Sequence, residues 1–200
     1  MARFSIGIDE AGRGSLAGPV AVGIIIAPKN FDITKAFPGV ADSKKLSEKK
    51  REEIFALLKQ KCKRMSSLRY IVVFASAKII DKKGISYAVR HTIYKGIRIL
   101  APDSSECHVV LDGLLKAPPE YSQQTIIRGD ASEPIISLAS IAAKVTRDRL
   151  MKRLAKQFPH YGFDEHKGYG TAAHYAAIER YGLCALHRRS FIHTLEKTKK

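Results

Sequence analysis

The stretch FSIGIDEAGRG, residues 4–14, decides the fold of this chain. Its first half alternates apolar with polar or small residues as far as Asp9, and this alternation predicts a β-strand. Gly12 and Gly14 end the pattern and predict a turn just after the acidic pair Asp9 and Glu10. A continuous apolar run rich in Val and Ile at residues 20–27 predicts a second strand, buried on both faces.

Further strands and helices alternate along the rest of the chain. Short apolar runs predict strands at residues 69–75, 108–111 and 125–127. Ser47 is the expected N-cap of a helix, because apolar residues at helical spacing follow it. The same spacing predicts helices over 85–100 and 132–157, and one or two more from Thr171.

The arrangement of these elements predicts an α/β fold. Residues 28–45 and 157–170 are expected to be loops, and small residues in the helix at 132–157 favour close packing on a sheet. We find no repeat, low-complexity tract or linker in the sequence. The pattern therefore predicts one domain over residues 1–200, with a loop and a helical appendage at about 158–200.

The composition suits a chain with a core of its own. Of the 200 residues, 45% are hydrophobic, which is enough to bury a core without disulfides. Cys62, Cys107 and Cys184 lie far apart and form no CxxC, so we expect incidental thiols in a reducing compartment. The apolar run near the start is far shorter than the roughly 20 residues that a membrane helix needs. We expect a cytoplasmic protein with no membrane association and no obligate protein partner, and a monomer by default.

The charge indicates a polyanionic partner. Lys and Arg number 35 against 19 Asp and Glu, which gives a net charge of +16. These charges are spread along the chain, so no tail accounts for them. Such a field favours nucleic acid as the partner. A merely soluble basic protein and a protein bound to anionic lipid are the alternatives.

Four acidic residues follow predicted strands in this basic chain. Asp9 and Glu10 end the first strand, and Asp112 and Asp130 follow two later ones. Ligand sites of open α/β sheets lie beyond the carboxyl ends of strands, so these carboxylates could converge there. Converging carboxylates repel one another unless a cation lies among them, and hard oxygen ligands suit Mg²⁺ or Mn²⁺. The alternative is that each Asp is a turn or cap residue, and spacing alone leaves both interpretations open.

Seven motifs carry a resemblance to a known family. In chain order they are GIDEAGRG (7–14) with LAGPV (16–20), DSKKLS (42–47), DG (112–113), GD (129–130), ASIAAKVTRD (139–148), HKGYGT (166–171) and HRRSF (187–191). In this order they resemble bacterial ribonuclease HII over residues 5–193. The resemblance implies a ribonuclease H-like fold, in which helices flank a mixed central sheet.

The resemblance also implies an activity and a set of site residues. It implies cleavage of RNA–DNA hybrids, and of duplex DNA on the 5′ side of an embedded ribonucleotide, leaving 3′-hydroxyl and 5′-phosphate ends. The implied mechanism is two-metal-ion hydrolysis with Mg²⁺ or Mn²⁺. The catalytic, metal-binding carboxylates would be Asp9, Glu10, Asp112 and Asp130. The turn Gly12-Arg13-Gly14 would sense the ribose 2′-hydroxyl and Tyr169 would stack on the sugar.

Several basic residues and departures from the family pattern stay open. Lys44 and Lys45 could contact phosphate or form a solvated turn. Lys144 and Arg147 could face phosphate or solvent, and His187-Arg188-Arg189 could bind the duplex or cap the C-terminal helices. The sequence departs from common family residues at Ser15, Gly84, Leu114 and Arg128, and Leu114 leaves the polar support of Asp112 in doubt.

Two rival functions remain to be weighed against a ribonuclease. One is a nucleic-acid-binding module without catalysis, which would gain nothing from carboxylates aimed at phosphates. The other is an enzyme of the same fold that acts on branched DNA junctions, which would have no 2′-hydroxyl to sense.

Overall fold

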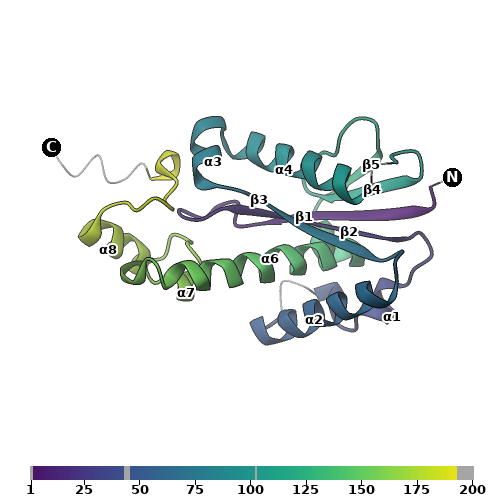
Figure 1. Cartoon of the computed structure of the whole chain (residues 1–200), viewed down its shortest axis with the longest axis horizontal. Helices are drawn as coiled ribbons and strands as arrows, with labels where there is room; N and C mark the ends of the chain where they lie inside the picture. The colour runs from purple at the N-terminus through teal and green to yellow at the C-terminus, as the bar shows by residue number, and fades with distance from the viewer. Residues whose placement is uncertain (1, 43–45, 102, 193–200) are drawn as a thin grey trace.

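A five-stranded mixed sheet forms the centre of the protein (Figure 1). The computed structural model describes residues 2–42, 46–101 and 103–192. The strands are β1 (Phe4–Ala11), β2 (Val20–Pro28), β3 (Arg69–Ala75), β4 (Cys107–Asp112) and β5 (Ser122–Ile126), in the order β3-β2-β1-β4-β5. Strands β1, β4 and β5 run parallel, whereas β2 is antiparallel to β1 and β3. The predicted mixed sheet is confirmed.

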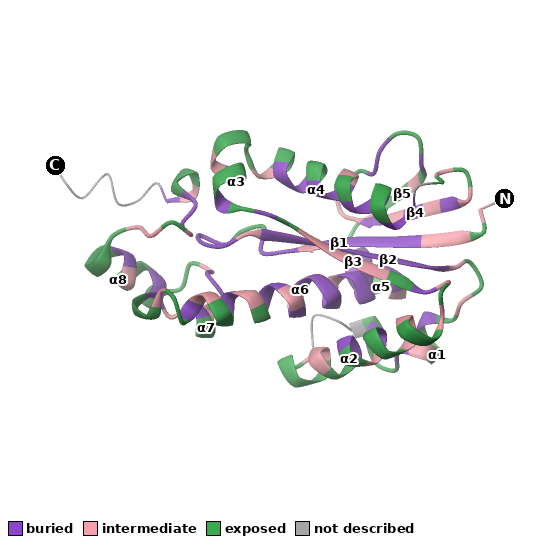
Figure 2. Ribbon diagram, viewed as in Figure 1, coloured by how far each residue is buried: buried purple, intermediate pink, exposed green. Residues whose placement is uncertain are grey.

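Helices cover both faces of the sheet (Figure 1). One face carries α3 (Ala77–Lys83) and α4 (Ile85–Leu100), and the other carries α1 (Ile33–Ala36), α2 (Glu48–Arg64) and α6 (Pro134–Ala155). A core cluster lies between the sheet and α4, and a second one lies between the sheet, α2 and α6. Figure 2 shows the buried residues on the inner faces and the exposed residues on the outer faces of α3 and α4.

The long helix α6 lies very close to the sheet because two strands carry glycine beneath it. A Cβ atom on Gly7 would lie 2.4 Å from the carbonyl oxygen of Ile135, and one on Gly23 would lie 2.2 Å from that of Ala139. Larger residues at these positions would push the helix away. The small residues of α6 complete this contact, as the sequence predicts, and they place the helix beside the end of β1.

The short helices account for most of the differences from the predicted elements. Residues predicted as loops contain α1, α7 (Phe163–His166) and the 3₁₀ turns Val40–Asp42 and Pro159–Tyr161. Helix α3 was not predicted, and β5 lies at 122–126 instead of 125–127. Helices of four to seven residues span too few turns for their periodicity to be recognised in a sequence.

The helix predicted at 132–157 corresponds to α6, and a separate short helix that was not predicted precedes it. A short helix, α5 (Gly129–Ser132), ends at Glu133, whose extended backbone separates it from α6. Pro134 then occupies the first turn of α6, where its missing N–H costs nothing. The break matters because α5 carries Asp130.

The predicted N-cap Ser47 is confirmed, and the structure shows a second N-cap at Thr171. The Ser47 side chain accepts a hydrogen bond from the Lys50 N–H at 3.2 Å, and Thr171 accepts one from His174 N–H at 3.2 Å. Thr171 begins the C-terminal helix α8 (Ala172–Tyr181), which is followed by the 3₁₀ turn Arg189–Phe191. No helix among the described residues has the length and apolar character needed to cross a membrane. The single domain with an appendage at about 158–200 stays a prediction.

Candidate active site

The sheet register brings the acidic residues to one edge. Strand β1 pairs with β4 in parallel, with Ile8 opposite Leu111, so Asp9 and Asp112 follow at the same end of neighbouring strands. Beyond β5, Arg128 adopts a left-handed backbone with φ of 56° and turns the chain into α5. There the Asp130 N–H donates to Asp112 Oδ1 at 3.3 Å.

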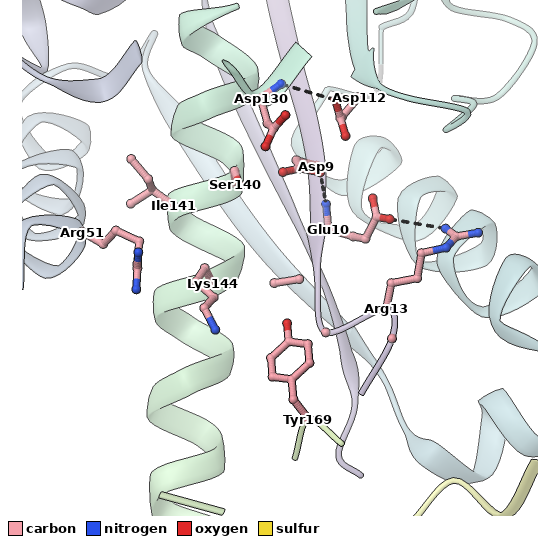
Figure 3. Close-up of a pocket in the computed structure, with 13 residues that line it drawn as sticks. Asp9, Glu10, Arg13, Arg51, Asp112, Asp130, Ser140, Ile141, Lys144 and Tyr169 are labelled. Atoms are coloured by element: carbon pink, nitrogen blue, oxygen red, sulfur yellow. Dashed lines mark hydrogen bonds and ion pairs between the residues drawn. The ribbon is translucent and has the colours of Figure 1, made fainter. Parts of the chain in front are cut away.

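All four predicted carboxylates line one cavity of about 460 Å³ (Figure 3). The Gly12-Arg13-Gly14 turn forms one wall, Tyr169 lies at its lower end in the figure, and Lys144 of α6 lies on the opposite side. The fold thus brings these predicted residues together from the ends of β1 and β4, the turn after β1, helices α5 and α6, and the loop that carries Tyr169. The remaining lining residues are Ala11, Arg51, Ser140 and Ile141.

The acidic end of β1 is electrostatically strained without a cation. Burial, together with the neighbouring Glu10 and Asp112, raises the pKa of Asp9 to about 8, against hydrogen bonds from Ser140 and the Glu10 N–H. Burial also raises the pKa of Glu10, although the Arg13 guanidinium opposes this effect. The Asp9 side chain accepts from the Glu10 N–H at 2.7 Å, and Arg13 Nη1 lies 3.3 Å from Glu10 Oε1.

The donor set fits a hard divalent cation. Glu10 Oε2 is buried and accepts no hydrogen bond from the described residues. Within residues 2–42, 46–101 and 103–192, no group of three carboxylate, His or Cys side chains is arranged to hold an ion alone. Mg²⁺ is usually bound by one or two carboxylates, with water and substrate phosphate oxygens supplying its other ligands. An all-oxygen cluster open to a cavity therefore suits Mg²⁺ or Mn²⁺ without a closed cage.

Replacing Asp9 with asparagine is expected to stabilise the metal-free protein at pH 8. The folded pKa of Asp9, about 8, lies above its usual value of 3.8. Protonated Asp9 therefore contributes its full stabilisation below the unfolded-state pKa of 3.8. This stabilisation is lost as the pH rises through the folded-state pKa of about 8. Asparagine keeps the side chain uncharged at every pH. We expect a gain of about 1 kcal/mol or more at pH 8, which raises Tm by about 2–4 °C.

Calorimetry of both proteins at pH 8 and pH 4 measures this effect. The gain should be much smaller at pH 4, where Asp9 is protonated in the folded chain and only partly ionised in the unfolded chain. Mg²⁺ or Mn²⁺ should raise the Tm of the unaltered protein more than that of Asp9→Asn. A lower Tm for Asp9→Asn at pH 8 would contradict the electrostatic strain.

Tyr169 is held by a directed chain of hydrogen bonds. His187 Nδ1 accepts from the Cys184 N–H at 2.9 Å, so its ring proton lies on Nε2, which faces His174 Nε2 at 3.1 Å. His174 in turn donates from Nδ1 to the Tyr169 carbonyl oxygen at 2.9 Å. Burial and His174 lower the pKa of His187 to about 4, which keeps this ring neutral near pH 7. The Tyr169 ring lies beneath Lys144 Nζ and Arg147 Cζ, at 5.2 and 5.4 Å.

Sequence reasoning missed two polar residues of the cavity. Ser140, on α6, hydrogen-bonds to Asp9, and Arg51, in the first turns of α2, donates to the Leu46 carbonyl oxygen. Ser140 lies in a motif that we interpreted as a packing surface, and its place opposite Asp9 depends on how α6 crosses the sheet. Lys44 and Lys45 lie outside the described residues.

Several of the other basic residues differ from the alternatives offered by the sequence. Arg147 is fully buried, so the expectations of solvent or phosphate contact are wrong for it. Lys144 lines the cavity and pairs with Asp148 at 2.9 Å. His187 and Arg188 are also buried, and the Arg188 side chain bonds to the turn after β1 instead of capping a helix.

Two departures from the family pattern have a structural explanation. Gly84 has φ of +81° where α3 ends and α4 begins, and this left-handed backbone suits glycine. Leu114 is 95% exposed and gives Asp112 no polar support. The backbone N–H of Asp130 supplies that support instead.

Comparisons with known proteins agree with this geometry. The sequence model of the family described as Ribonuclease HII matches residues 6–194. A ribonuclease HII of Geobacillus kaustophilus is 43% identical over 185 residues, which are 92% of this chain and 66% of that protein. One from Geobacter metallireducens is 44% identical over 187 residues, which are 92% of this chain and 82% of that protein. The chain thus spans slightly less than two thirds of the length of the Geobacillus relative.

The likeness extends to solved structures. A complex of PCNA with ribonuclease HII from Archaeoglobus fulgidus matches with a TM-score of 0.76 and 25% identity. The match covers 98% of this chain and 97% of the matched chain. The predicted ribonuclease H-like fold is confirmed.

Proposed function

Because this chain belongs to the ribonuclease HII family, a family of ribonuclease H hydrolases, we propose that it is an endonuclease acting on ribonucleotides in duplexes. It would cut the RNA strand of RNA–DNA hybrids and cut on the 5′ side of ribonucleotides embedded in duplex DNA. The products would carry 3′-hydroxyl and 5′-phosphate ends. The observation that carries this proposal is the cavity shared by four carboxylates and the Gly12-Arg13-Gly14 turn.

The carboxylates form the chemical half of the proposed site. Asp9, Glu10, Asp112 and Asp130 would hold Mg²⁺ or Mn²⁺. When bound, two such ions would activate water and stabilise the leaving oxygen in phosphodiester hydrolysis. The buried Glu10 Oε2, which has no hydrogen-bond partner among the described residues, and the raised pKa of Asp9 support this role, because a bound cation would stabilise the ionised carboxylates there.

The opposite wall forms the recognition half of the proposed site. The Gly12-Arg13-Gly14 turn would approach the sugar closely, and the 2′-hydroxyl is the group that distinguishes RNA from DNA there. The Tyr169 hydroxyl points toward the carboxylates in Figure 3, so its ring is placed to meet a sugar that lies between them and the turn. Lys144 adds positive charge to the cavity, and the net charge of +16 favours the polyanionic duplex.

The same features disfavour the rival functions. A module that only binds nucleic acid would lose affinity by directing buried carboxylates at phosphates. An enzyme for branched DNA would have no use for a turn that senses a 2′-hydroxyl. We propose the cytoplasm as the location, because this activity needs access to duplexes that contain ribonucleotides.

One gel experiment tests the proposal. The substrate is an end-labelled DNA duplex with a single ribonucleotide, and the control is the same duplex without it. With Mg²⁺ or Mn²⁺ we expect one cut on the 5′ side of the ribonucleotide, and with a chelator we expect none. Equal cleavage of the all-DNA duplex, or cleavage in the chelator, would refute the proposed function.

A further inference from the structure

Arg188 joins the C-terminal part of the chain to the turn after β1. Its guanidinium is fully buried, and its partners are backbone carbonyl oxygens. Nη2 donates to Gly12 at 2.7 Å, Nη1 to Arg13 at 2.8 Å, and Nε to Gly18 at 3.0 Å. The planar fork of one side chain therefore holds both ends of the loop that carries the Gly12-Arg13-Gly14 turn.

The rest of this loop is held from the same side. Arg147 donates to the carbonyl oxygens of Pro19 and Ala17 at 2.9 and 3.2 Å. The Arg188 N–H donates to the Leu16 carbonyl oxygen at 2.7 Å. Two buried guanidinium groups thus donate to a set of carbonyl oxygens, and the loop backbone is held by donors that stay charged near pH 7, although burial and Arg147 lower the pKa of Arg188 to about 9.

The direction of these carbonyl groups fixes the direction of the neighbouring N–H groups. In a trans peptide unit, the C=O of one residue and the N–H of the next point in opposite directions. The Gly12 and Arg13 carbonyl groups point to Arg188, so the N–H groups of Arg13 and Gly14 point away from it. All three residues of the turn line the cavity, whereas Arg188 does not.

We propose that Arg188 is a positioning residue, which sets the two peptide planes of the Gly12-Arg13-Gly14 turn so that their N–H groups face the substrate sugar. It acts through the turn and does not touch the substrate, because it is fully buried. This inference rests on the proposed function, and it adds the residue that gives the turn its orientation. Lysine at this position would keep the charge but lose the planar fork that engages three carbonyl groups at once.

Helix α3 fixes the position of the segment that carries Arg188. Asp81 accepts hydrogen bonds from the Arg189 and Ser190 N–H groups, both at 3.0 Å, and from Ser190 Oγ at 2.6 Å. Arg188 also lies over the Phe191 ring, 5.2 Å from its centre. Asp81 does not line the cavity, so a change there loosens the anchor of Arg188 while the turn and Arg188 themselves keep their side chains.

The test compares Arg188→Lys with Arg189→Lys, the same substitution at the exposed neighbouring position. The kcat and KM on a duplex with one ribonucleotide are measured together with Tm and the affinity for an all-DNA duplex. For Arg188→Lys we expect kcat to fall on the order of 10- to 100-fold, as a slightly misplaced catalytic geometry produces. The affinity of the folded protein for all-DNA duplex should stay within about twofold, because phosphate contacts dominate it. Arg189→Lys should match the unaltered protein.

Asp81→Ala provides a second route if Arg188→Lys does not fold. It should lower kcat on the same duplex by about 3- to 10-fold, again without loss of affinity for all-DNA duplex. The inference is overturned if the folded variants keep the kcat of the unaltered protein. It is also overturned if kcat and DNA binding fall in equal proportion, as a merely structural role predicts. Inactivity of the unaltered protein would instead refute the proposed function.

Discussion

Replacing Asp130 with asparagine should reduce cleavage of a ribonucleotide-containing duplex by at least about 10³-fold, which corresponds to about 4 kcal/mol of transition-state stabilisation. Only 4% of Asp130 is exposed, and the substitution removes its charge while keeping its shape. The backbone contacts survive, because the Asp130 N–H still reaches Asp112 and its carbonyl oxygen still accepts from Ser137 Oγ at 2.7 Å. The lost activity would therefore report the lost ligand oxygen and its charge.

Asp164→Asn is the matched control, because Asp164 is exposed on α7 and does not line the cavity. Single-turnover rates with saturating Mg²⁺ and the dissociation constant for the uncut duplex are measured for all three proteins. Duplex affinity should be unchanged or slightly higher for Asp130→Asn, because one negative charge has been removed. If Asp130→Asn kept more than about a tenth of the normal rate, Asp130 would not belong to the catalytic set.

Replacing Gly12 with alanine should be the most damaging change in the recognition wall. Gly12 has φ of +82°, and an added Cβ would lie 1.9 Å from Arg147 Nε and 2.5 Å from its Cζ. The Arg147 guanidinium is buried and bonded to two carbonyl groups, so it cannot move aside without losing them. The left-handed backbone alone costs about 1–2 kcal/mol for alanine. We expect a total destabilisation of about 3 kcal/mol or more and a fall in kcat/KM of about 100-fold.

Gly14→Ala is the control for stability, because no heavy atom lies within 4 Å of its added Cβ and its φ is not left-handed. Urea unfolding should show a free energy of unfolding within about 0.5 kcal/mol of the unaltered value for Gly14→Ala. The same unfolding experiment should show a free energy of unfolding that is lower by about 3 kcal/mol or more for Gly12→Ala. Equal stability of the two variants would mean that the turn rearranges readily to accept a Cβ atom at Gly12. Arg147 could not then be a rigid support of this turn.

The sheet and the acidic residues were predictable because their signals are local. The Val- and Ile-rich run at 20–27 is typical of a buried strand, and each proposed ligand ends or follows a predicted strand. The register that places Asp9 beside Asp112 is a tertiary fact, yet it follows once β1 and β4 are parallel neighbours. The order of the strands was not predictable from periodicity, and the family resemblance implied only a mixed sheet flanked by helices.

The buried arginines could not be predicted, for a physical reason. In a chain of net charge +16, an arginine is by default a solvated residue. Arg147 and Arg188 are buried only because a loop from the other end of the chain turns its carbonyl groups toward them. Neither the two arginines nor the loop that contacts them has a sequence pattern that predicts this contact. The position of Ser140 opposite Asp9 depends in the same way on the glycines that let α6 approach the sheet.

The contact between Arg188 and Gly12 spans 176 positions of the sequence, and this distance imposes an order on biosynthesis. A ribosome finishes all four carboxylates by residue 130, so a growing chain holds every proposed metal ligand well before residue 188 is added. Such a nascent chain would contain the four proposed metal ligands but would lack Arg188, which positions the Gly12-Arg13-Gly14 turn. The ability to select a ribonucleotide would therefore appear only after the segment around Arg188 docks onto the turn after β1.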